Sequence, residues 1–274
     1  RSTLFPYTTL FRSPYSDIHG AYKAMIQCLD RANFDPSGDK LIQLGDVTDG
    51  YPEVYECVEE LLKTPHLIPL KGNHDDWFDE FCKTDFHPYF WTYGGKGTLV
   101  SYLKHAGKNR SFRASGSGYK TSLTAADIPG THNDFFSSQQ LYHVDDQNRF
   151  FVHAGFNRHL PLNKQRQEDF YWDRILWPEA LQIQTYQRGA ASNGTFFSGT
   201  DFSEIYIGHT PTTKWNTDQP LRALNILNLD TGAGHSGRLT IMDIDTKQFW
   251  QSDSLPELYD QNFRNEPPQS RNLL

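Results

Sequence analysis

The sequence contains little cysteine and no long apolar run. Its 274 residues include only Cys28, Cys57 and Cys82, an odd number without Cys-x-x-Cys spacing. We therefore expect neither a disulfide framework nor a cysteine-built zinc site, and a reducing cytoplasm is the compartment that fits best. No stretch of about 18 apolar residues occurs, so the sequence predicts no membrane-spanning helix.

The chain also lacks an excess of basic charge. Its formal net charge is -7 at pH 7, whereas domains that bind nucleic acid through phosphate contacts are usually basic. We therefore expect neither a nucleic acid nor a membrane as a partner. Aromatic residues make up 14% of the chain, which argues against a disordered protein. An acidic, folded protein leaves room for a metal site in which carboxylates meet cations.

Residues 1–13 differ in character from the rest of the chain. Residues 3–13 read TLFPYTTLFRS, which is the in-frame translation of a common short-read sequencing adapter. We therefore predict that residues 1–13 are non-native and that 14–274 form a single domain. A strand should run into Asp17, so this segment has replaced part of its native sequence. The polar tail after about Leu258 is expected to fray.

From residue 14 onward, helical and strand patterns alternate. Apolar residues recur at helical spacing over 21–33 and 52–63, and shorter helical patterns are expected at 99–105 and within 163–199. Alternation of strand, polar turn and helix predicts an α/β fold with parallel strand pairing. The expected strands are the short apolar runs at 40–44, 66–70, 148–152, 205–207 and 225–229, followed by a β-rich end over 238–251.

Five short polar motifs follow these apolar runs. In parallel sheets, functional residues collect just beyond the carboxyl ends of the strands. Oxygen and imidazole donors without thiolates suit Mn, Fe or Zn, and the donor set does not choose among them. Each motif alone could be a helix cap or a plain turn, but five in series indicate one site. They are Asp17-Ile18-His19-Gly20, Gly45-Asp46-Val47-Thr48-Asp49, Gly72-Asn73-His74-Asp75, His153-Ala154-Gly155 and Gly208-His209-Thr210.

This motif set resembles the calcineurin-like metallophosphoesterases and, within them, the phosphoprotein phosphatase superfamily of bacterial type. The family pattern is Gly-Asp-x-His-Gly, Gly-Asp-x-x-Asp-Arg-Gly, Gly-Asn-His-Glu/Asp, His-Gly/Ala-Gly and Gly-His-Thr, and the resemblance spans about 16–234. It implies a four-layer α/β/β/α sandwich with two mixed sheets. It also implies metal-dependent hydrolysis of a phosphate ester by direct attack of water, without a covalent enzyme intermediate.

The resemblance also implies roles for individual residues. His74 would protonate the leaving alkoxide, and Asp49 would orient its ring. Two divalent ions are implied, with Mn expected and Fe or Zn as alternatives. Asp17 and His19 would hold the first ion, Asp46 would bridge both, and Asn73, His153 and His209 would complete the second site.

Three positions depart from the family pattern. Ser16 stands where Gly is usual, Tyr51-Pro52 follows where the motif would continue with Gly, and Gly50 replaces the Arg that grips the substrate phosphate. Another arginine must then supply that donor. Arg174, in a segment resembling the Trp-x-Arg stretch of bacterial relatives, is the first candidate, although it could equally pair with a neighbouring carboxylate on the surface. Arg158 is the second candidate.

The substrate class remains open at this stage. We expect a phosphomonoesterase that acts on phosphorylated protein, with serine/threonine or dual specificity, or on a small phosphoester. For such an enzyme, we expect an open, shallow groove. The alternative is a hydrolase similar to bis(5'-nucleosyl)-tetraphosphatases, which predicts a deeper slot with an aromatic wall and extra cations. A metal-binding module without turnover is a third reading. The glycines at 94–97 are expected to form a lid or a turn, and His235 has no predicted role.

Overall fold

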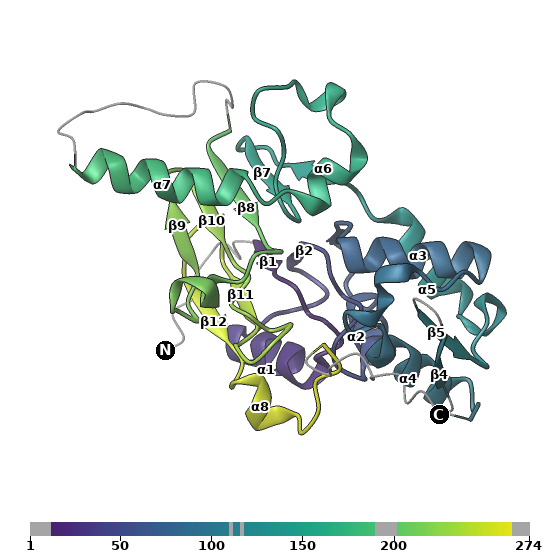
Figure 1. Ribbon diagram of the computed structural model, residues 1–274. Coiled ribbons are helices and arrows are strands. Elements are labelled where there is room, and N and C mark those ends of the chain that lie inside the picture. Colours follow the sequence, from purple (N-terminus) through teal and green to yellow (C-terminus); the bar gives the residue numbers. More distant parts are fainter. Residues whose placement is uncertain (1–11, 110–111, 116–117, 190–201, 265–274) are drawn as a thin grey trace, which may run out of the picture.

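The computed structural model describes residues 12–109, 112–115, 118–189 and 202–264, and its frame is a pair of five-stranded mixed sheets (Figure 1). The first sheet has the order β12-β11-β1-β2-β3, and the second has the order β6-β7-β8-β10-β9. Each sheet contains three consecutive parallel strands, β1-β2-β3 and β7-β8-β10, with antiparallel strands outside them. The predicted parallel pairing is confirmed.

The strands are short and mostly buried. Those of the first sheet are β1 (Arg12–Tyr15), β2 (Lys40–Gln43), β3 (Leu67–Pro69), β11 (Thr240–Met242) and β12 (Phe249–Gln251). Those of the second sheet are β6 (Tyr142–Val144), β7 (Arg149–Val152), β8 (Glu204–Ile207), β9 (Leu221–Ala223) and β10 (Ile226–Asn228). A separate hairpin consists of β4 (Phe112–Ser115) and β5 (Gly118–Thr121).

The two sheets pack face to face. Their shared core takes apolar side chains from both sheets and from the residues just after the strands. Burial of apolar surface on both sides of each sheet is what drives such a layered arrangement. This inner core consists of Ile42, Leu44, Leu70, Phe151, Tyr206, Leu227, Leu229, Met242 and Ile244.

Helices cover the outer face of each sheet, which completes the four layers predicted for the family (Figure 1). The first sheet is covered by α1 (Tyr22–Ala32) and α2 (Val54–Leu61). Beside them, α3 (Asn73–Thr84), α4 (Gly95–His105) and α5 (Gly130–Ser138) extend the same core cluster away from the sheet (Figure 1). The second sheet is covered by α6 (Gln167–Trp172) and α7 (Leu176–Gly189). Short 3-10 turns lie at Tyr89–Thr92, Ala125–Asp127, Leu162–Lys164 and Thr212–Trp215.

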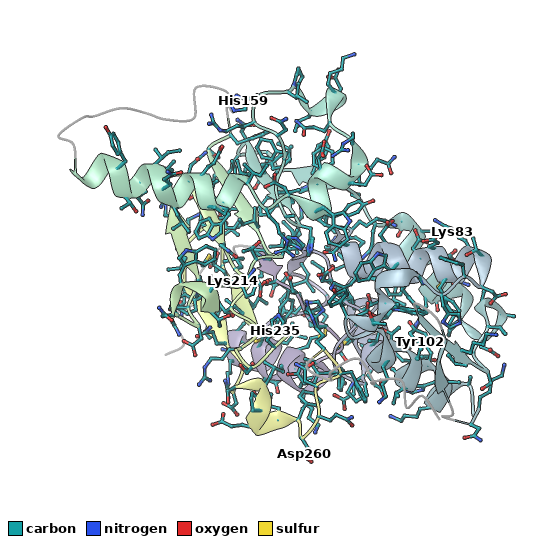
Figure 2. All side chains as sticks on the ribbon, in the orientation of Figure 1. Lys83, Tyr102, His159, Lys214, His235 and Asp260 are labelled. Atoms are coloured by element: carbon teal, nitrogen blue, oxygen red, sulfur yellow. The ribbon has the colours of Figure 1, made fainter. Side chains whose placement is uncertain are left out.

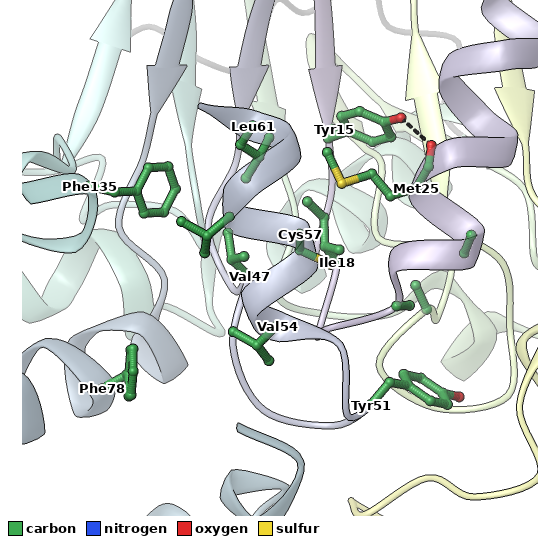
Figure 3. Close-up of a cluster of buried hydrophobic side chains, with 14 of the residues drawn as sticks. Tyr15, Ile18, Met25, Val47, Tyr51, Val54, Cys57, Leu61, Phe78 and Phe135 are labelled. Atoms are coloured by element: carbon green, nitrogen blue, oxygen red, sulfur yellow. Dashed lines mark hydrogen bonds between the residues drawn. The ribbon is translucent and has the colours of Figure 1, made fainter. Parts of the chain in front are cut away.

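The largest core cluster lies between the first sheet and its helices (Figure 3). Met25 of α1 and Val54, Cys57 and Leu61 of α2 point toward the sheet. The hydroxyl of Tyr15, at the end of β1, donates a hydrogen bond of 2.8 Å to the carbonyl oxygen of Met25. This bond fixes α1 against the strand that leads into the first polar motif.

Strand β1 contains the boundary of the predicted non-native segment, and residues 1–11 lie outside the described parts of the chain. Ser13 is fully buried in β1, and its Oγ has no hydrogen-bond partner among the described residues. Burial of an unpaired hydroxyl is unfavourable, which fits the expectation of a polar residue in place of an apolar one. The non-native origin of 1–13 stays a prediction.

Several boundaries differ from the expectations. Gly72-Asn73-His74-Asp75 does not form a turn but begins α3, and α5 has no clear periodicity in the sequence. The predicted fraying after Leu258 is wrong for residues 259–264, which follow α8 (Leu255–Leu258) and pack against the loop after β2. Residues 265–274 lie outside the described parts of the chain. None of the described helices is long and apolar enough to cross a membrane.

Candidate metal centre

The parallel strands bring the five polar motifs to one edge of the sandwich. Asp17 lies two residues after β1 and Asp46 three residues after β2, while Asn73 begins α3 after β3. His153 directly follows β7, and His209 lies two residues after β8. Because the carboxyl ends of parallel strands meet at the same edge, each sheet delivers its side chains to the same place.

Asp46 lies at the middle of the cluster. Its Oδ2 is 3.7 Å from Nε2 of His19 and 3.4 Å from Nε2 of His153. Two groups of three side chains share Asp46, and the ligand atoms of each group lie within 4.8 Å of one another. The groups are Asp17-His19-Asp46 and Asp46-His153-His209, which is the arrangement that two ions bridged by one carboxylate require.

Hydrogen bonds on the far side of the rings orient the histidines. Nδ1 of His19 donates to the carbonyl oxygen of Thr48 at 2.9 Å, and Nδ1 of His153 donates to that of Leu44 at 2.8 Å. Both rings therefore turn the lone pair of Nε2 into the cluster. Nδ1 of His209 lies only 3.1 Å from Nε2 of His153, and two ring nitrogens at this distance need a proton or a cation between them.

The side chain of Asn73 joins the same cluster from the first turn of α3. Its Oδ1 is 3.3 Å from Nε2 of His153. An amide oxygen is a neutral ligand that suits divalent ions alongside carboxylate and imidazole. All six predicted ligands therefore converge on one place, and their assignment as ligands remains our proposal.

The buried carboxylates of the cluster carry negative charge that cations would stabilise. Burial, together with neighbouring Asp46, raises the pKa of Asp17 to about 6. Burial also raises the pKa of Asp230 well above its usual range, with a further contribution from Asp17. Burial alone would raise the pKa of Asp46, but His153 and other nearby imidazoles hold it well below its usual range. Buried carboxylates packed this closely are stabilised by metal ions, so the donor set fits a dinuclear centre.

The backbone of the site is held in an unusual conformation. His19, Asp46, Asp49 and His209 have φ angles of 51°, 57°, 65° and 67°, in the left-handed region that few non-glycine residues adopt. Gly72 allows the close approach of two loops, because a Cβ at this position would lie 2.1 Å from Oδ1 of Asp46. Gly45 and Gly208 meet the same requirement, because a Cβ there would lie 2.6 Å from Nδ1 of His153 and 2.2 Å from Oδ1 of Asp17.

Asp75 ties the loops that carry the ligands together. It is fully buried, and its Oδ1 accepts hydrogen bonds from the backbone nitrogens of Val47 and Thr48 at 2.8 and 3.1 Å. Its Oδ2 accepts a bond of 2.8 Å from Nε2 of Gln139. No role was predicted for Asp75 from the sequence, although its place directly after His74 in the third motif could have indicated one.

His74 and Asp49 form a hydrogen-bonded pair beside the cluster. Nδ1 of His74 lies 2.8 Å from Oδ2 of Asp49, and the backbone nitrogen of His74 donates to Oδ1 of Asp46 at 3.0 Å. Oδ1 of Asp49 accepts bonds from Nε1 of Trp91 at 2.8 Å and from Oγ1 of Thr98 at 2.6 Å. The carboxylate is thereby fixed, and the sequence offered no motif that identified Trp91 or Thr98.

A cavity of about 70 Å³ opens over these side chains. Cationic or titratable residues from outside the motifs line its rim: Arg174, Lys214, His235 and Arg264. Lys214 and His235 lie near the centre of the molecule in Figure 2. Of these four residues, the sequence analysis selected only Arg174, because the others lie in no recognisable pattern.

The two predicted phosphate-binding arginines occupy different places. Arg174 lines the cavity over the metal ligands, and among the described residues it forms no ion pair, so the surface pairing considered as the alternative is absent. Nε of Arg158 instead lies 3.0 Å from Oε2 of Glu179. Arg158 lines a neighbouring cavity of about 760 Å³, which meets the first cavity at Arg174.

Comparison with known proteins identifies the family. The sequence matches the Calcineurin-like phosphoesterase family over residues 15–236. The chain belongs to this family. It is therefore a hydrolase that acts on phosphoesters, and the family depends on a dinuclear metal centre, for which the described residues supply two candidate ligand groups. The recognition of the family from the five motifs is confirmed.

Individual relatives are distant. Serine/threonine-protein phosphatase 1 of Salmonella typhimurium is 23% identical over 230 residues, which cover 83% of this chain and 89% of that protein. A protein proposed to be a diadenosine tetraphosphatase shares the fold with a TM-score of 0.58 at 16% identity, over 90% of this chain and 95% of that one. A cold-active protein tyrosine phosphatase has a TM-score of 0.50 at 13% identity, over 91% and 81% of the two chains.

Proposed function

We propose that this protein is a phosphomonoesterase that removes phosphate from serine and threonine side chains, with manganese as its metal. The observation that carries the proposal is the small cavity in which the His74–Asp49 pair faces two ligand groups sharing Asp46. This cavity of about 70 Å³ lies directly over the two ligand groups, so a phosphoryl group in it would meet both ions. The likeness to a serine/threonine-protein phosphatase supports the same substrate class.

The ligand groups define what the metal ions would do. When bound, two divalent ions would lower the pKa of water and offset the negative charge of the phosphoryl group. The donor set of carboxylate, amide and imidazole groups suits manganese and equally iron or zinc. One ion would be held by Asp17, His19 and Asp46, and the other by Asp46, Asn73, His153 and His209.

His74 is the proposed general acid. Its Nδ1 is engaged by Asp49, so Nε2 is the nitrogen that remains to protonate the leaving alkoxide of the substrate. The hydrogen bond with Asp49 fixes the orientation of the ring and therefore the position of Nε2. Trp91 and Thr98 keep Asp49 in place by donating to its other oxygen. This intact pair argues against a metal-binding module without turnover.

The neighbouring cavity of about 760 Å³ would receive the remainder of the substrate. Two of its three arginines are paired with carboxylates, since Arg158 contacts Glu179 and Arg166 contacts Asp169. A polyphosphate would need cations that are available to it, whereas a polypeptide makes mixed polar contacts. The cavity therefore favours a phosphorylated protein as substrate, and Arg174, at its junction with the metal centre, is the proposed phosphate contact.

One observation favours a nucleotide substrate as the second candidate. The ring of Trp172 is 40% exposed in the neighbouring cavity, and its centroid lies 5.6 Å from that of Trp77 and 6.0 Å from that of His209. An exposed indole is a surface on which a nucleobase stacks. A dinucleoside tetraphosphate would place a base on Trp172.

A substrate panel separates these two functions. The purified protein is stripped of metal and reloaded with Mn²⁺. Phosphate release is measured with an aryl phosphate and with phosphoserine, phosphothreonine and phosphotyrosine peptides, and nucleotide products are measured with diadenosine tetraphosphate and cyclic nucleotides. We expect the phosphoserine and phosphothreonine peptides to have the highest kcat/KM. Preferred cleavage of diadenosine tetraphosphate would establish the second candidate instead. Turnover of none of them, with two metal ions bound, would refute both.

The state of the cysteines supports a proposal for the cellular compartment. The described cysteines are free, and two of them, Cys28 and Cys57, are buried. Free thiols persist in reducing surroundings, so we propose a bacterial cytoplasm as the setting of the reaction.

A further inference from the structure

The loop at Gly50 lacks the arginine that the family pattern places there to bind the substrate phosphate. The chain segment 259–264 returns from α8 and lies on this loop. The backbone nitrogen of Phe263 donates to the carbonyl oxygen of Gly50 at 3.1 Å, and the Phe263 side chain is buried. The next residue, Arg264, extends from there into the cavity over the metal ligands.

Two glycines, Gly94 and Gly234, leave the space through which the Arg264 side chain passes, and Gly50 lies within ordinary contact distance of it. A Cβ at Gly50 would lie 3.6 Å from Cδ of Arg264, and a Cβ at Gly94 would lie 2.5 Å from its Cγ. A Cβ at Gly234 would lie 2.3 Å from its Nη1. These positions come from three distant parts of the sequence, and at Gly94 and Gly234 any side chain would collide with the arginine. The protein therefore contains a channel that fits this one side chain.

The guanidinium group ends among the candidate metal ligands. Nη1 of Arg264 donates to Nε2 of His19 at 2.5 Å. Nδ1 of His19 is already bonded to the carbonyl oxygen of Thr48, so this is the lone pair with which His19 would hold an ion. Arg264 shares the cavity with His74, the proposed general acid, and with Asp230.

Asn262 anchors the segment and so determines where Arg264 begins. Its Nδ2 donates to the hydroxyl oxygen of Tyr51 at 3.0 Å and to the carbonyl oxygen of His235 at 2.9 Å. Its Oδ1 accepts a bond of 2.9 Å from the backbone nitrogen of Arg264. The ring of Tyr259 packs on that of Tyr51 with centroids 4.5 Å apart. The segment is thus held on both sides of the channel.

We propose that Arg264 binds the phosphate of the substrate, in place of the arginine that is missing at Gly50. A guanidinium group presents N–H donors in a planar fork that matches two oxygens of a phosphate. An ion bound to Nε2 of His19 would take the lone pair that Arg264 now uses, and the N–H donors would then be available to an oxyanion in the same cavity. This inference rests on the proposed phosphoesterase function of the site.

The same contact has a competing explanation. Arg264 would then only occupy the position of a metal ion and lower the affinity of the site for metal. A third explanation treats Arg264 as an anchor for the chain segment alone. The three explanations differ in whether removal of the guanidinium changes phosphate affinity, metal affinity or neither.

The test measures inorganic phosphate binding by calorimetry on Mn²⁺-loaded protein, together with Mn²⁺ affinity of the stripped protein. We expect Arg264→Ala to weaken phosphate binding by about ten- to a hundredfold, because charge-assisted hydrogen bonds are lost. Mn²⁺ affinity should not rise. Arg264→Lys should recover only part of the affinity, since an ammonium group lacks the fork. Arg222→Ala, which removes an exposed arginine of β9, is the matched control and should bind phosphate like the unaltered protein.

A second variant leaves Arg264 unchanged but removes the bonds that hold its chain segment in place. Asn262→Ala removes the anchoring bonds and should weaken phosphate binding in the same direction. In steady-state assays, Arg264→Ala should raise KM for a phosphomonoester more than it lowers kcat. Unchanged phosphate affinity in Arg264→Ala overturns the inference, whether Mn²⁺ affinity rises or not. Failure of the proposed function is a different result, namely phosphate binding without turnover of any phosphoester by the unaltered protein.

Discussion

The metal-ligand cluster and the cationic rim above it belong to one cavity but are built differently. Each ligand of the cluster follows a strand or begins α3, and the rings of His19 and His153 are fixed by backbone carbonyls. The rim takes Arg174 from the turn before α7 and Arg264 from the last described residues. The backbone at the strand ends therefore places each ligand in the site, whereas the arginines of the rim extend into the site through their long side chains.

This difference explains why the motifs identified one part of the site and missed the other. A ligand must be placed within a few tenths of an ångström, so it lies next to a strand end whose position the sheet fixes. A guanidinium on a long flexible side chain can approach a phosphate from several directions. The position of such an arginine in the sequence can therefore change. In this protein, glycine stands at position 50, and Arg264 is the proposed phosphate contact.

The largest effect is expected within the cluster. His74→Asn should lower kcat by about 10²–10⁴, the usual range for a lost general acid, while two Mn²⁺ ions per chain remain bound. The reason is that His74 contributes its backbone nitrogen, not its ring, to the hydrogen bonding of Asp46. Steady-state kinetics with metal analysis check both parts. A variant with near-normal kcat would remove His74 from the mechanism.

The next effect concerns the stability of the cluster. Asp75→Ala should lower the free energy of unfolding by about 3 kcal/mol, because the buried nitrogens of Val47 and Thr48 lose their acceptor. Asp75→Asn keeps an acceptor for these two nitrogens and should cost about 1 kcal/mol. Urea denaturation of the Mn²⁺-loaded proteins measures both. Equal stability of all three proteins would show that Asp75 does not hold the loops together.

The smallest effect is expected at the rim, where Arg174 can be compared with Arg158 of the neighbouring cavity. Arg174→Ala should lower kcat/KM for a phosphomonoester by about tenfold through a higher KM, because one charged donor to the phosphate is lost. Arg158→Ala should leave kcat/KM for an aryl phosphate nearly unchanged, since Arg158 lies in the neighbouring cavity and contacts Glu179. If Arg158→Ala lowered kcat/KM more than Arg174→Ala in steady-state kinetics, Arg158 and not Arg174 would be the phosphate contact.

Much of the fold was predictable because local patterns report it directly. The apolar spacing of 21–33 and the runs before Asp46 and His153 predicted α1, β2 and β7 to within two residues. Helix α4 begins earlier than expected, at Gly95, so that glycines expected in a lid or a turn lie in its first turn. A Cβ at Gly95 would lie 2.1 Å from the ring of Trp91. The glycines serve close packing at this point, and no local pattern reveals such a requirement.

The amino-acid sequence by itself determined the family, the α/β layering and the six candidate ligands with the His74–Asp49 pair. These features depend on residues near one another in the chain, at the ends of strands whose pairing follows from hydrophobic pattern. Only the tertiary structure decided which cationic side chains lie beside the candidate metal ligands. It also decided that Trp91, Thr98 and Asp75 hold the loops in place. Arg264 lies 245 residues from His19, and only the packing of segment 259–264 across Gly50 brings the two side chains together.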